Sequence, residues 1–134
     1  MASKVFINLP VQNLEASRDF FSSLGFSFNP QFSDDKAACM VVSDSIFVML
    51  LQDTYFQTFT KKPISDAKKS TEVLIALDAN SREEVQSMVD KTVAAGGRIY
   101  AEAADHGWMY QHSFEDLDGH QWELAYMDMS KMPG

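Results

Sequence analysis

The pattern of apolar and polar positions along the chain repeats once. In each half, an apolar run with strand-like alternation, at residues 5–11 and 73–77, precedes an amphipathic run with helical spacing. Glycine follows each amphipathic run, and short strand-like runs come after it. We therefore predict two copies of a β-α-β-β-β unit. A repeat of this kind builds two related half-sheets, and we expect a pocket between them.

Both predicted helices have recognisable ends. Asn13 is a suitable N-cap for the first helix, and Ser81 and Glu84 form a capping-box pattern at the start of the second. Gly25 stands where a residue in the left-handed conformation is expected to close the first helix. The apolar stripes of both helices are expected to pack against the aliphatic faces of the sheets.

The repeat also divides the chain. We predict one α+β domain over residues 1–134, with module one at about 4–52, a connection at about 53–70 and module two at about 71–127. The two βαβββ modules are expected to form a curled mixed sheet with each helix on its outside. A chain of this length can bury roughly two-thirds of its unfolded surface. The tail after Tyr126 is expected to fray or to dock at an interface.

Composition excludes several classes of partner. The net charge is -8, and binding to nucleic acid would need a basic patch, so no nucleic-acid partner is expected. No apolar run approaches the roughly 20 residues of a membrane span, and the first residues lack the apolar core of a secretory signal. Cys39 is the one cysteine, which rules out an intrachain disulfide and is compatible with a reducing compartment. We expect a cytoplasmic protein without a membrane partner.

Side chains of a strand alternate between its two faces, so each predicted strand has an aliphatic face and a second face. The aliphatic faces, such as that of Leu9 and Val11, should pack on the helices. The second faces then line the concave side of the sheet, where two carboxylates stand among apolar side chains. The residues assigned to this side are Phe6, Asn8, Phe47, Met49, Glu72 and Glu123.

Aromatic and thioether side chains are predicted to meet on this concave side of the sheet, which we call the cup. Trp108 and Tyr110 could join Phe6, Phe47 and Met49 in a wall for a flat apolar ligand. Alternatively, some of these side chains simply fill the cup and close it. Both interpretations fit a cup in which apolar residues predominate.

The three histidines and the cysteine are further candidates for chemistry. His106 and His112 are about 20 Å apart on an extended strand, which is too far for one ion to bridge. His112 either lines the cavity or lies outside it, and His120 is expected to face solvent in a turn. Cys39 lies in an apolar run typical of a strand in the core, without an obvious base to activate it.

Two segments resemble a known family. Residues 9–26, LPVQNLEASRDFFSSLGF, are similar to the opening pattern V-x-D-L-x-x-S-x-x-F-Y-x-x-L-G-F of the vicinal oxygen chelate superfamily. Residues 114–124, FEDLDGHQWEL, resemble its closing pattern D-P-D-G-x-x-x-E-L. This superfamily includes glyoxalase I, bleomycin-resistance proteins and extradiol dioxygenases, and the resemblance covers essentially the whole chain. The most similar subgroup is that of predicted lactoylglutathione lyases. The resemblance implies a homodimer.

The resemblance also implies a set of metal-ligand positions. Metal-dependent members place four ligands on the concave faces of the first, fourth, fifth and eighth strands, which correspond here to Phe6, Met49, Glu72 and Glu123. Phenylalanine cannot ligate, and a thioether is a poor ligand for a hard or borderline divalent ion. Glu72 and Glu123 therefore remain as an incomplete set for a divalent metal such as Ni, Zn, Co or Mn, with Asn8 as a weak substitute.

Three functions stay open on this reasoning. The first is binding of a small organic molecule for sequestration or transport, which the missing ligands at Phe6 and Met49 favour. The second is a lyase or isomerase resembling lactoylglutathione lyase, with Glu72 and Glu123 as metal ligands or with one of them as a metal-free base. The third is a structural or interaction module with a filled cup. Fold alone does not decide among them.

Overall fold

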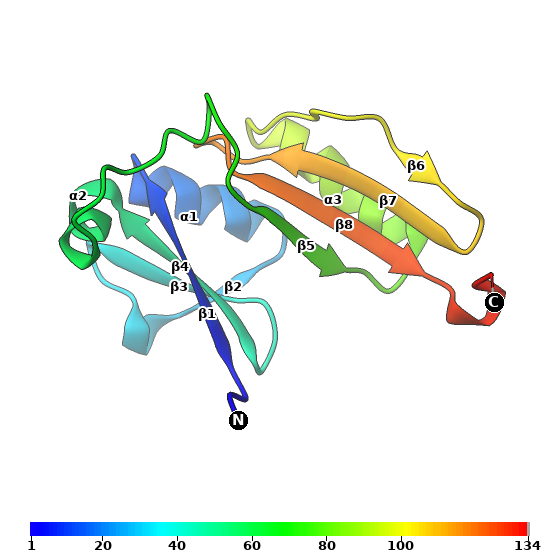
Figure 1. Cartoon of the computed structure of the whole chain (residues 1–134), viewed down its shortest axis with the longest axis horizontal. Coiled ribbons are helices and arrows are strands. Elements are labelled where there is room, and N and C mark those ends of the chain that lie inside the picture. Colours follow the sequence, from blue (N-terminus) through cyan, green and yellow to red (C-terminus); the bar gives the residue numbers. More distant parts are fainter. Residues whose placement is uncertain (134) are drawn as a thin grey trace. The chain divides into compact units, whose positions relative to one another are not determined.

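The strands and helices of the repeat form as the alternating pattern predicts. The computed structural model describes residues 1–133, and the chain divides into two compact units, Met1–Asp66 and Ala67–Gly134. Each unit contains one βαβββ module with a four-stranded mixed sheet, as Figure 1 shows. The predicted fold class is therefore confirmed. Gly134, the last residue of the predicted domain and tail, lies outside the described residues.

The first unit has its parallel strands at one side of the sheet. The strand order is β1-β4-β3-β2, with β1 parallel to β4 and the other pairs antiparallel. Helix α1 packs on the face formed by β3 and β4. Its elements are β1 (Val5–Val11), α1 (Leu14–Ser23), β2 (Ser27–Asn29), η1 (Pro30–Phe32), β3 (Ala37–Val41), β4 (Ile46–Gln52), α2 (Asp53–Phe56) and η2 (Gln57–Phe59).

Helix α1 begins and ends where the sequence predicts. The side chain of Asn13 accepts a hydrogen bond of 3.0 Å from the backbone N–H of Ala16. Phe20 and Phe21 are buried on the inner stripe. Gly25 has a φ of 106°, a conformation that side chains with a Cβ rarely adopt. The cap, the apolar stripe and the glycine together fix this helix against its sheet.

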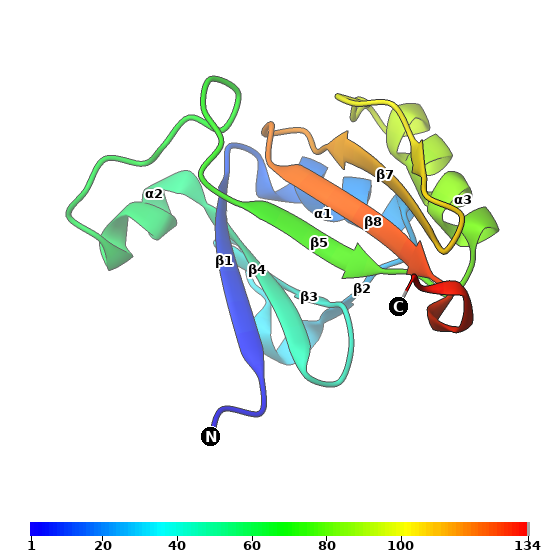
Figure 2. The ribbon, with the colours of Figure 1, turned by 45° about the vertical axis from the view of Figure 1, so that its right-hand side comes forward.

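The second unit repeats the arrangement. The strand order is β5-β8-β7-β6, and β5 runs parallel to β8. Figures 1 and 2 show α3 along one face of β7 and β8. The side chain of Ser81 accepts a hydrogen bond from the backbone N–H of Glu84, as the capping box predicts. Its elements are β5 (Leu74–Asp78), α3 (Arg82–Ala94), β6 (Ala104–Asp105), β7 (Met109–Glu115), β8 (Gln121–Met127) and η3 (Met129–Lys131).

The turn between β7 and β8 is organised by Asp116. One carboxylate oxygen, Oδ1, accepts hydrogen bonds from the backbone N–H groups of Asp118 and His120, each at 3.0 Å. The other, Oδ2, accepts from the indole Nε1 of Trp122 at 3.0 Å. Trp122 is fully buried and stacks on Phe114, with ring centroids 6.1 Å apart. The aspartate therefore connects the turn to the core of this unit.

Gly119 in the same turn leaves room for the chain segment that precedes β5. Its φ is +89°, and a Cβ there would lie 2.9 Å from Cγ and 3.0 Å from Cα of Lys68. We expect Gly119→Ala to lower the free energy of unfolding by about 1–3 kcal/mol, because the backbone of Lys68 would have to shift and the left-handed conformation would be strained. Urea denaturation followed by circular dichroism would measure this. Gly107→Ala, with a similar φ of +82° but open space around it, is the matched control for the strain alone.

Candidate functional site

The open face of the second unit's sheet carries Glu123. In β8, Trp122 and Leu124 are buried toward α3, whereas Glu123 points to the opposite face and is half-buried. Ser113 of β7 and Ala76 of β5 lie directly beside it in the ladder. This is the face to which strand alternation assigns Glu123.

A neutral polar group holds the carboxylate of Glu123. The side-chain amide of Gln111 donates a hydrogen bond to its Oε2. On the same face, the hydroxyl of Tyr100 is hydrogen-bonded to the side chain of Ser113. Burial raises the pKa of Tyr100, and the charges of Glu123 and Glu115 raise it further. The phenol thus stays protonated near a carboxylate, which makes it a hydrogen-bond donor at neutral pH.

The second carboxylate of this face, Glu115, is paired with a cation. Its Oε1 lies 3.2 Å from Nε of Arg98, and its Oε2 accepts a hydrogen bond of 2.9 Å from the side chain of Gln121. Gln121 in turn accepts one of 2.9 Å from the hydroxyl of Thr71. No lysine or arginine in residues 1–133 forms an ion pair with Glu123. Glu123 is therefore the carboxylate of this face that could bind a ligand without first breaking an ion pair.

The open face of the first unit is aromatic. The rings of Phe6 and Phe47 stack with centroids 4.9 Å apart and an interplanar angle of 12°. Asn8 pairs with Met49 in the ladder between β1 and β4, and its side-chain amide donates to the carbonyl oxygen of Phe6 at 3.3 Å. Phe6 is 53% exposed, so this pair is not part of the buried core. Three predicted pocket residues, Phe6, Phe47 and Met49, thus share one face.

Glu72 does not lie where the sequence places it. Strand β5 begins at Leu74, so Glu72 precedes it in a bend and is exposed. Glu123 lies level with Ala76, and Leu74 is already two residues, or roughly 7 Å, away along the strand. The extended pattern predicted from residue 72 onward thus breaks down before β5, because exposed residues 71–73 have no strand partner.

The donor set does not fit a divalent metal. Phe6 offers no donor, Met49 offers a thioether, and Glu72 is separated from Glu123. Over the described residues 1–133, no group of three or more histidine, cysteine, aspartate or glutamate side chains could hold a metal ion. Structural and catalytic metal sites ordinarily use three or four protein ligands. The incomplete set predicted from the family pattern is not completed by neighbouring residues within either unit.

Tyr110 and His112 lie on the other face of the second sheet. His112 pairs with Leu124, is 7% exposed and faces α3, and its Nδ1 has no hydrogen-bond partner. Tyr110 donates a hydrogen bond of 3.1 Å to the side chain of Gln86 in α3. The predicted wall is therefore corrected at these two positions, because the register of β7 turns Gln111 and Ser113 toward Glu123. Trp108 precedes β7 and is half-buried.

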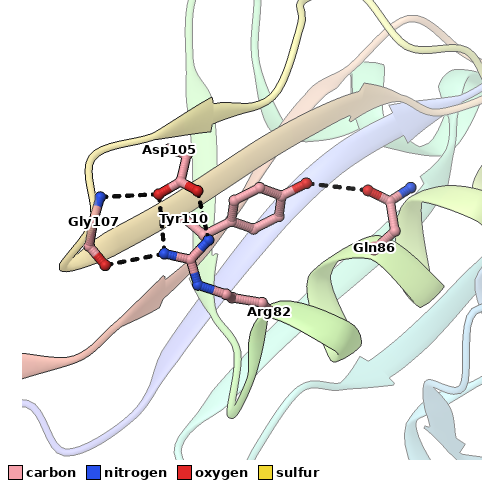
Figure 3. Close-up of polar contacts among 5 residues, drawn as sticks. All are labelled: Arg82, Gln86, Asp105, Gly107 and Tyr110. Carbon is pink, nitrogen blue, oxygen red and sulfur yellow. Dashed lines mark hydrogen bonds and ion pairs between the residues drawn. The ribbon is translucent and has the colours of Figure 1, made fainter.

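Sequence reasoning missed the ion pair that fixes the start of α3, drawn in Figure 3. The guanidinium of Arg82 binds both oxygens of Asp105, at 2.7 and 2.9 Å, and donates to the carbonyl oxygen of Gly107 at 3.0 Å. It also lies 5.3 Å from the ring centre of Tyr110. The hydrogen bonds from Arg82 and from the Gly107 N–H lower the pKa of Asp105 to about 2. The Asp105-x-Gly107 turn is the one local signal that could have indicated this cluster.

A cavity of about 240 Å³ lies beside this ion pair, at the first turn of α3. The side chains that line it carry both signs of charge, with Arg82 and Lys131 against Glu83 and Asp128. Such a mixed lining does not select an anion or a cation. The remaining lining residues are Ser81, Gly107 and Tyr126.

Cys39 has the structural role that the sequence predicts. It is almost fully buried in β3, and burial raises the pKa of its thiol. Its backbone N–H donates to the hydroxyl of Ser33 at 3.0 Å. A buried thiol with a raised pKa is a poor nucleophile.

Comparison with known proteins agrees with this architecture. Residues 4–43 match the family model described as bleomycin resistance protein-like N-terminal. A glyoxalase-related enzyme from Fulvimarina pelagi superposes with a TM-score of 0.79 at 21% identity, covering 94% of this chain and 88% of that one. The fosfomycin resistance protein FosX from Listeria monocytogenes superposes with a TM-score of 0.69 at 18% identity, covering 94% and 93%. A comparison with curated proteins found no match.

The two βαβββ modules and these matches define the class by its fold: the chain has the fold of the vicinal oxygen chelate superfamily of glyoxalase, bleomycin-resistance and dioxygenase proteins, and residues 4–43 match a bleomycin-resistance family model. The chain is also similar to the hypothetical protein SA1046 from S. aureus, at 32% identity and a TM-score of 0.79, with 94% of this chain and 95% of that one covered. In the part of the chain that is described, no helix has the length and apolar character that a membrane crossing requires.

Proposed function

We propose that each of the two sheets presents an open face that can bind a small organic molecule, and that this binding needs no divalent metal. The observation that carries the proposal is the stacked pair of Phe6, which is exposed, and Phe47, which is half-buried; the family pattern places a metal ligand at Phe6. An aromatic pair with an exposed ring suits apolar contact with a ligand rather than coordination. The chain would act as a dimer in the cytoplasm, as its family resemblance and its single cysteine suggest.

Glu123 is the polar anchor in this proposal. Its carboxylate has an amide partner in Gln111 and, among residues 1–133, no cation partner, so it can accept a hydrogen bond from a ligand hydroxyl or amine. The Tyr100 phenol and the Ser113 hydroxyl on the same face provide a donor and a second acceptor. These three groups of the second unit would orient a ligand on this face.

An enzymatic alternative rests on the same carboxylate. Glu123 keeps the ligand position of the eighth strand, and one structural relative is described as a glyoxalase-related enzyme. In a lyase or isomerase of this kind, Glu123 would act as the general base and Tyr100 would donate a hydrogen bond to the developing oxyanion. Gln111 would hold the carboxylate in position.

Metal content separates the metal-free proposal from a metal-dependent lyase in which Glu123 is a metal ligand. We expect chelator-stripped protein that is loaded separately with nickel, cobalt, zinc and manganese, and then desalted, to retain only substoichiometric metal by mass spectrometry. The reason is that the described residues supply no third ligand. Retention of one ion per chain, lost in Glu123→Gln but kept in Glu102→Gln, would support the metal-dependent lyase instead. Glu102 is an exposed glutamate outside the strands, which makes it a charge-matched control.

Ligand binding tests the proposal directly. A library of small organic molecules, examined by ligand-observed NMR on the full chain, is expected to contain binders whose affinity falls about 10-fold or more in Glu123→Gln. A charge-assisted hydrogen bond contributes about that much, roughly 1.5–3 kcal/mol. Glu102→Gln should leave the affinity unchanged. If no molecule in the library binds, or if both variants bind equally well, the proposed role of Glu123 is wrong.

A further inference from the structure

The aromatic pair of the first unit has one free ring face. Phe6 and Phe47 stack nearly parallel, so one face of each ring covers the other. Strand β1 is the edge strand of its sheet, and β4 is its single neighbour there. The second face of the Phe6 ring therefore points away from β4, and Phe6 is 53% exposed. A planar ring could stack on it in the same offset geometry.

A lysine lies next to this pair. Lys4 immediately precedes β1, two residues before Phe6, and strand alternation places its side chain on the same face. Its Nζ lies 5.8 Å from the ring centre of Phe47. In a chain with 19 acidic and 11 basic residues, no carboxylate of residues 1–133 forms an ion pair with this ammonium. The aromatic pair is thus bordered by a positive charge that is available to a ligand.

We infer that Phe6, Phe47 and Lys4 recognise a planar aromatic molecule that carries a carboxylate. The ligand ring stacks on the free face of Phe6, and its carboxylate pairs with the Lys4 ammonium. Side-chain rotation of Lys4 gives the reach, because the Cα atoms of residues 4 and 6 are only about 7 Å apart. This inference rests on the proposed function and names the chemical class of its ligand. An uncharged or non-planar molecule would satisfy only half of the site.

Three probes separate the two interactions, and two of them share the naphthalene ring. Isothermal titration of the full chain with 2-naphthoate is expected to show binding that weakens as salt is added, because the ion pair is exposed. The alcohol 2-naphthalenemethanol keeps the ring and lacks the charge, and cyclohexanecarboxylate keeps the charge and lacks the planar ring. Both are expected to bind more weakly than 2-naphthoate. Equal binding of 2-naphthoate and cyclohexanecarboxylate would overturn the stacking.

Substitutions at Phe6 and Lys4 test whether 2-naphthoate binds on this face. Phe6→Leu keeps an apolar side chain and removes the ring, and we expect it to weaken 2-naphthoate binding about 3- to 10-fold. Lys4→Gln is expected to weaken it about 2- to 5-fold and to remove most of the salt dependence, with Lys4→Arg restoring both. Phe32→Leu and Lys61→Gln, at an exposed phenylalanine and an exposed lysine elsewhere in this unit, are the matched controls.

The outcomes separate this inference from the proposed function. If other molecules bind in the library screen and 2-naphthoate does not, the inference fails and the proposed function stands. If nothing binds, both fail. A variant at Phe6 that changes the sedimentation mass and leaves 2-naphthoate affinity unaltered would show that a second copy of the chain covers this face, which also overturns the inference. Amide NMR spectra of each variant would confirm that it is folded.

Discussion

Replacing Asp116 by alanine is expected to lower the free energy of unfolding by about 3–5 kcal/mol. The carboxylate accepts hydrogen bonds from two backbone N–H groups of the β7–β8 turn and from the indole of Trp122. Alanine would leave these donors without an acceptor, and an unsatisfied buried donor costs about 1–3 kcal/mol. Urea denaturation followed by tryptophan fluorescence and circular dichroism would measure the loss.

Two further variants test the reason for this loss. Asp116→Asn keeps one carbonyl oxygen and should be intermediate, because its amide N–H₂ cannot accept from the Trp122 indole. Asp44→Asn removes a carboxylate from an exposed position and should change stability by less than about 0.5 kcal/mol. If Asp116→Ala were no more destabilised than Asp44→Asn, the turn would not depend on this carboxylate.

The pKa of Asp116 determines whether the stability of the protein rises or falls with pH. Burial raises the pKa of Asp116, although the charge of His120 and the Trp122 hydrogen bond partly oppose this. Because the folded-state pKa lies above the ordinary value of 3.8, the stabilising contribution of protonation is full below 3.8 and is lost as pH rises through the folded-state pKa. The stability of the wild type relative to Asp116→Asn should therefore fall over that interval.

The second prediction concerns the ion pair at the start of α3. Replacing Arg82 by glutamine is expected to move the pKa of Asp105 from about 2 toward its ordinary value of 3.8. The Arg82 hydrogen bonds are the largest cause of the low pKa, and glutamine offers neither the charge nor the two parallel N–H groups. Carboxyl-carbon NMR shifts recorded against pH would give both values.

The lowered pKa of Asp105 also determines how the stabilisation of the β6–β7 loop by the ion pair changes with pH. The folded-state pKa of Asp105 is lowered, so the stabilisation by the ion pair is present above 3.8 and is lost as pH falls through about 2. Lys131→Gln is the matched control, since Lys131 pairs with Asp128 at 3.9 Å and not with Asp105. An Asp105 pKa that stays near 2 in Arg82→Gln would show that the turn hydrogen bond of Gly107, rather than the guanidinium, is responsible.

These two clusters differ in how far they could be predicted. Asp116 belongs to a closing segment that is readable in the sequence, with Asp118, Gly119 and Trp122 close by, and its contacts span no more than six residues. Arg82 and Asp105 are 23 residues apart and meet only because β6 folds back beside the start of α3. No local pattern encodes such a contact, since it depends on how the strands pair.

The assignment of side chains to the two faces of each strand divides in the same way, into what strand parity predicts locally and what depends on strand pairing. Alternation places Phe6, Phe47 and Met49 on one face and Trp122 opposite Glu123, because strand parity is a local property. It did not place Glu72, because strand pairing begins only at Leu74. It left the orientation of His112 open, and this was decided by its ladder partner Leu124.

What the sequence by itself determined was the repeat, the helix ends, the apolar faces and the family, since each depends on short-range periodicity, capping or a contiguous motif. What only the tertiary structure decided was which side chains meet: Gln111 with Glu123, Arg98 with Glu115, and Arg82 with Asp105. The physical reason is that register and loop closure bring together residues that are distant in the chain, and neither leaves a periodic trace in the sequence.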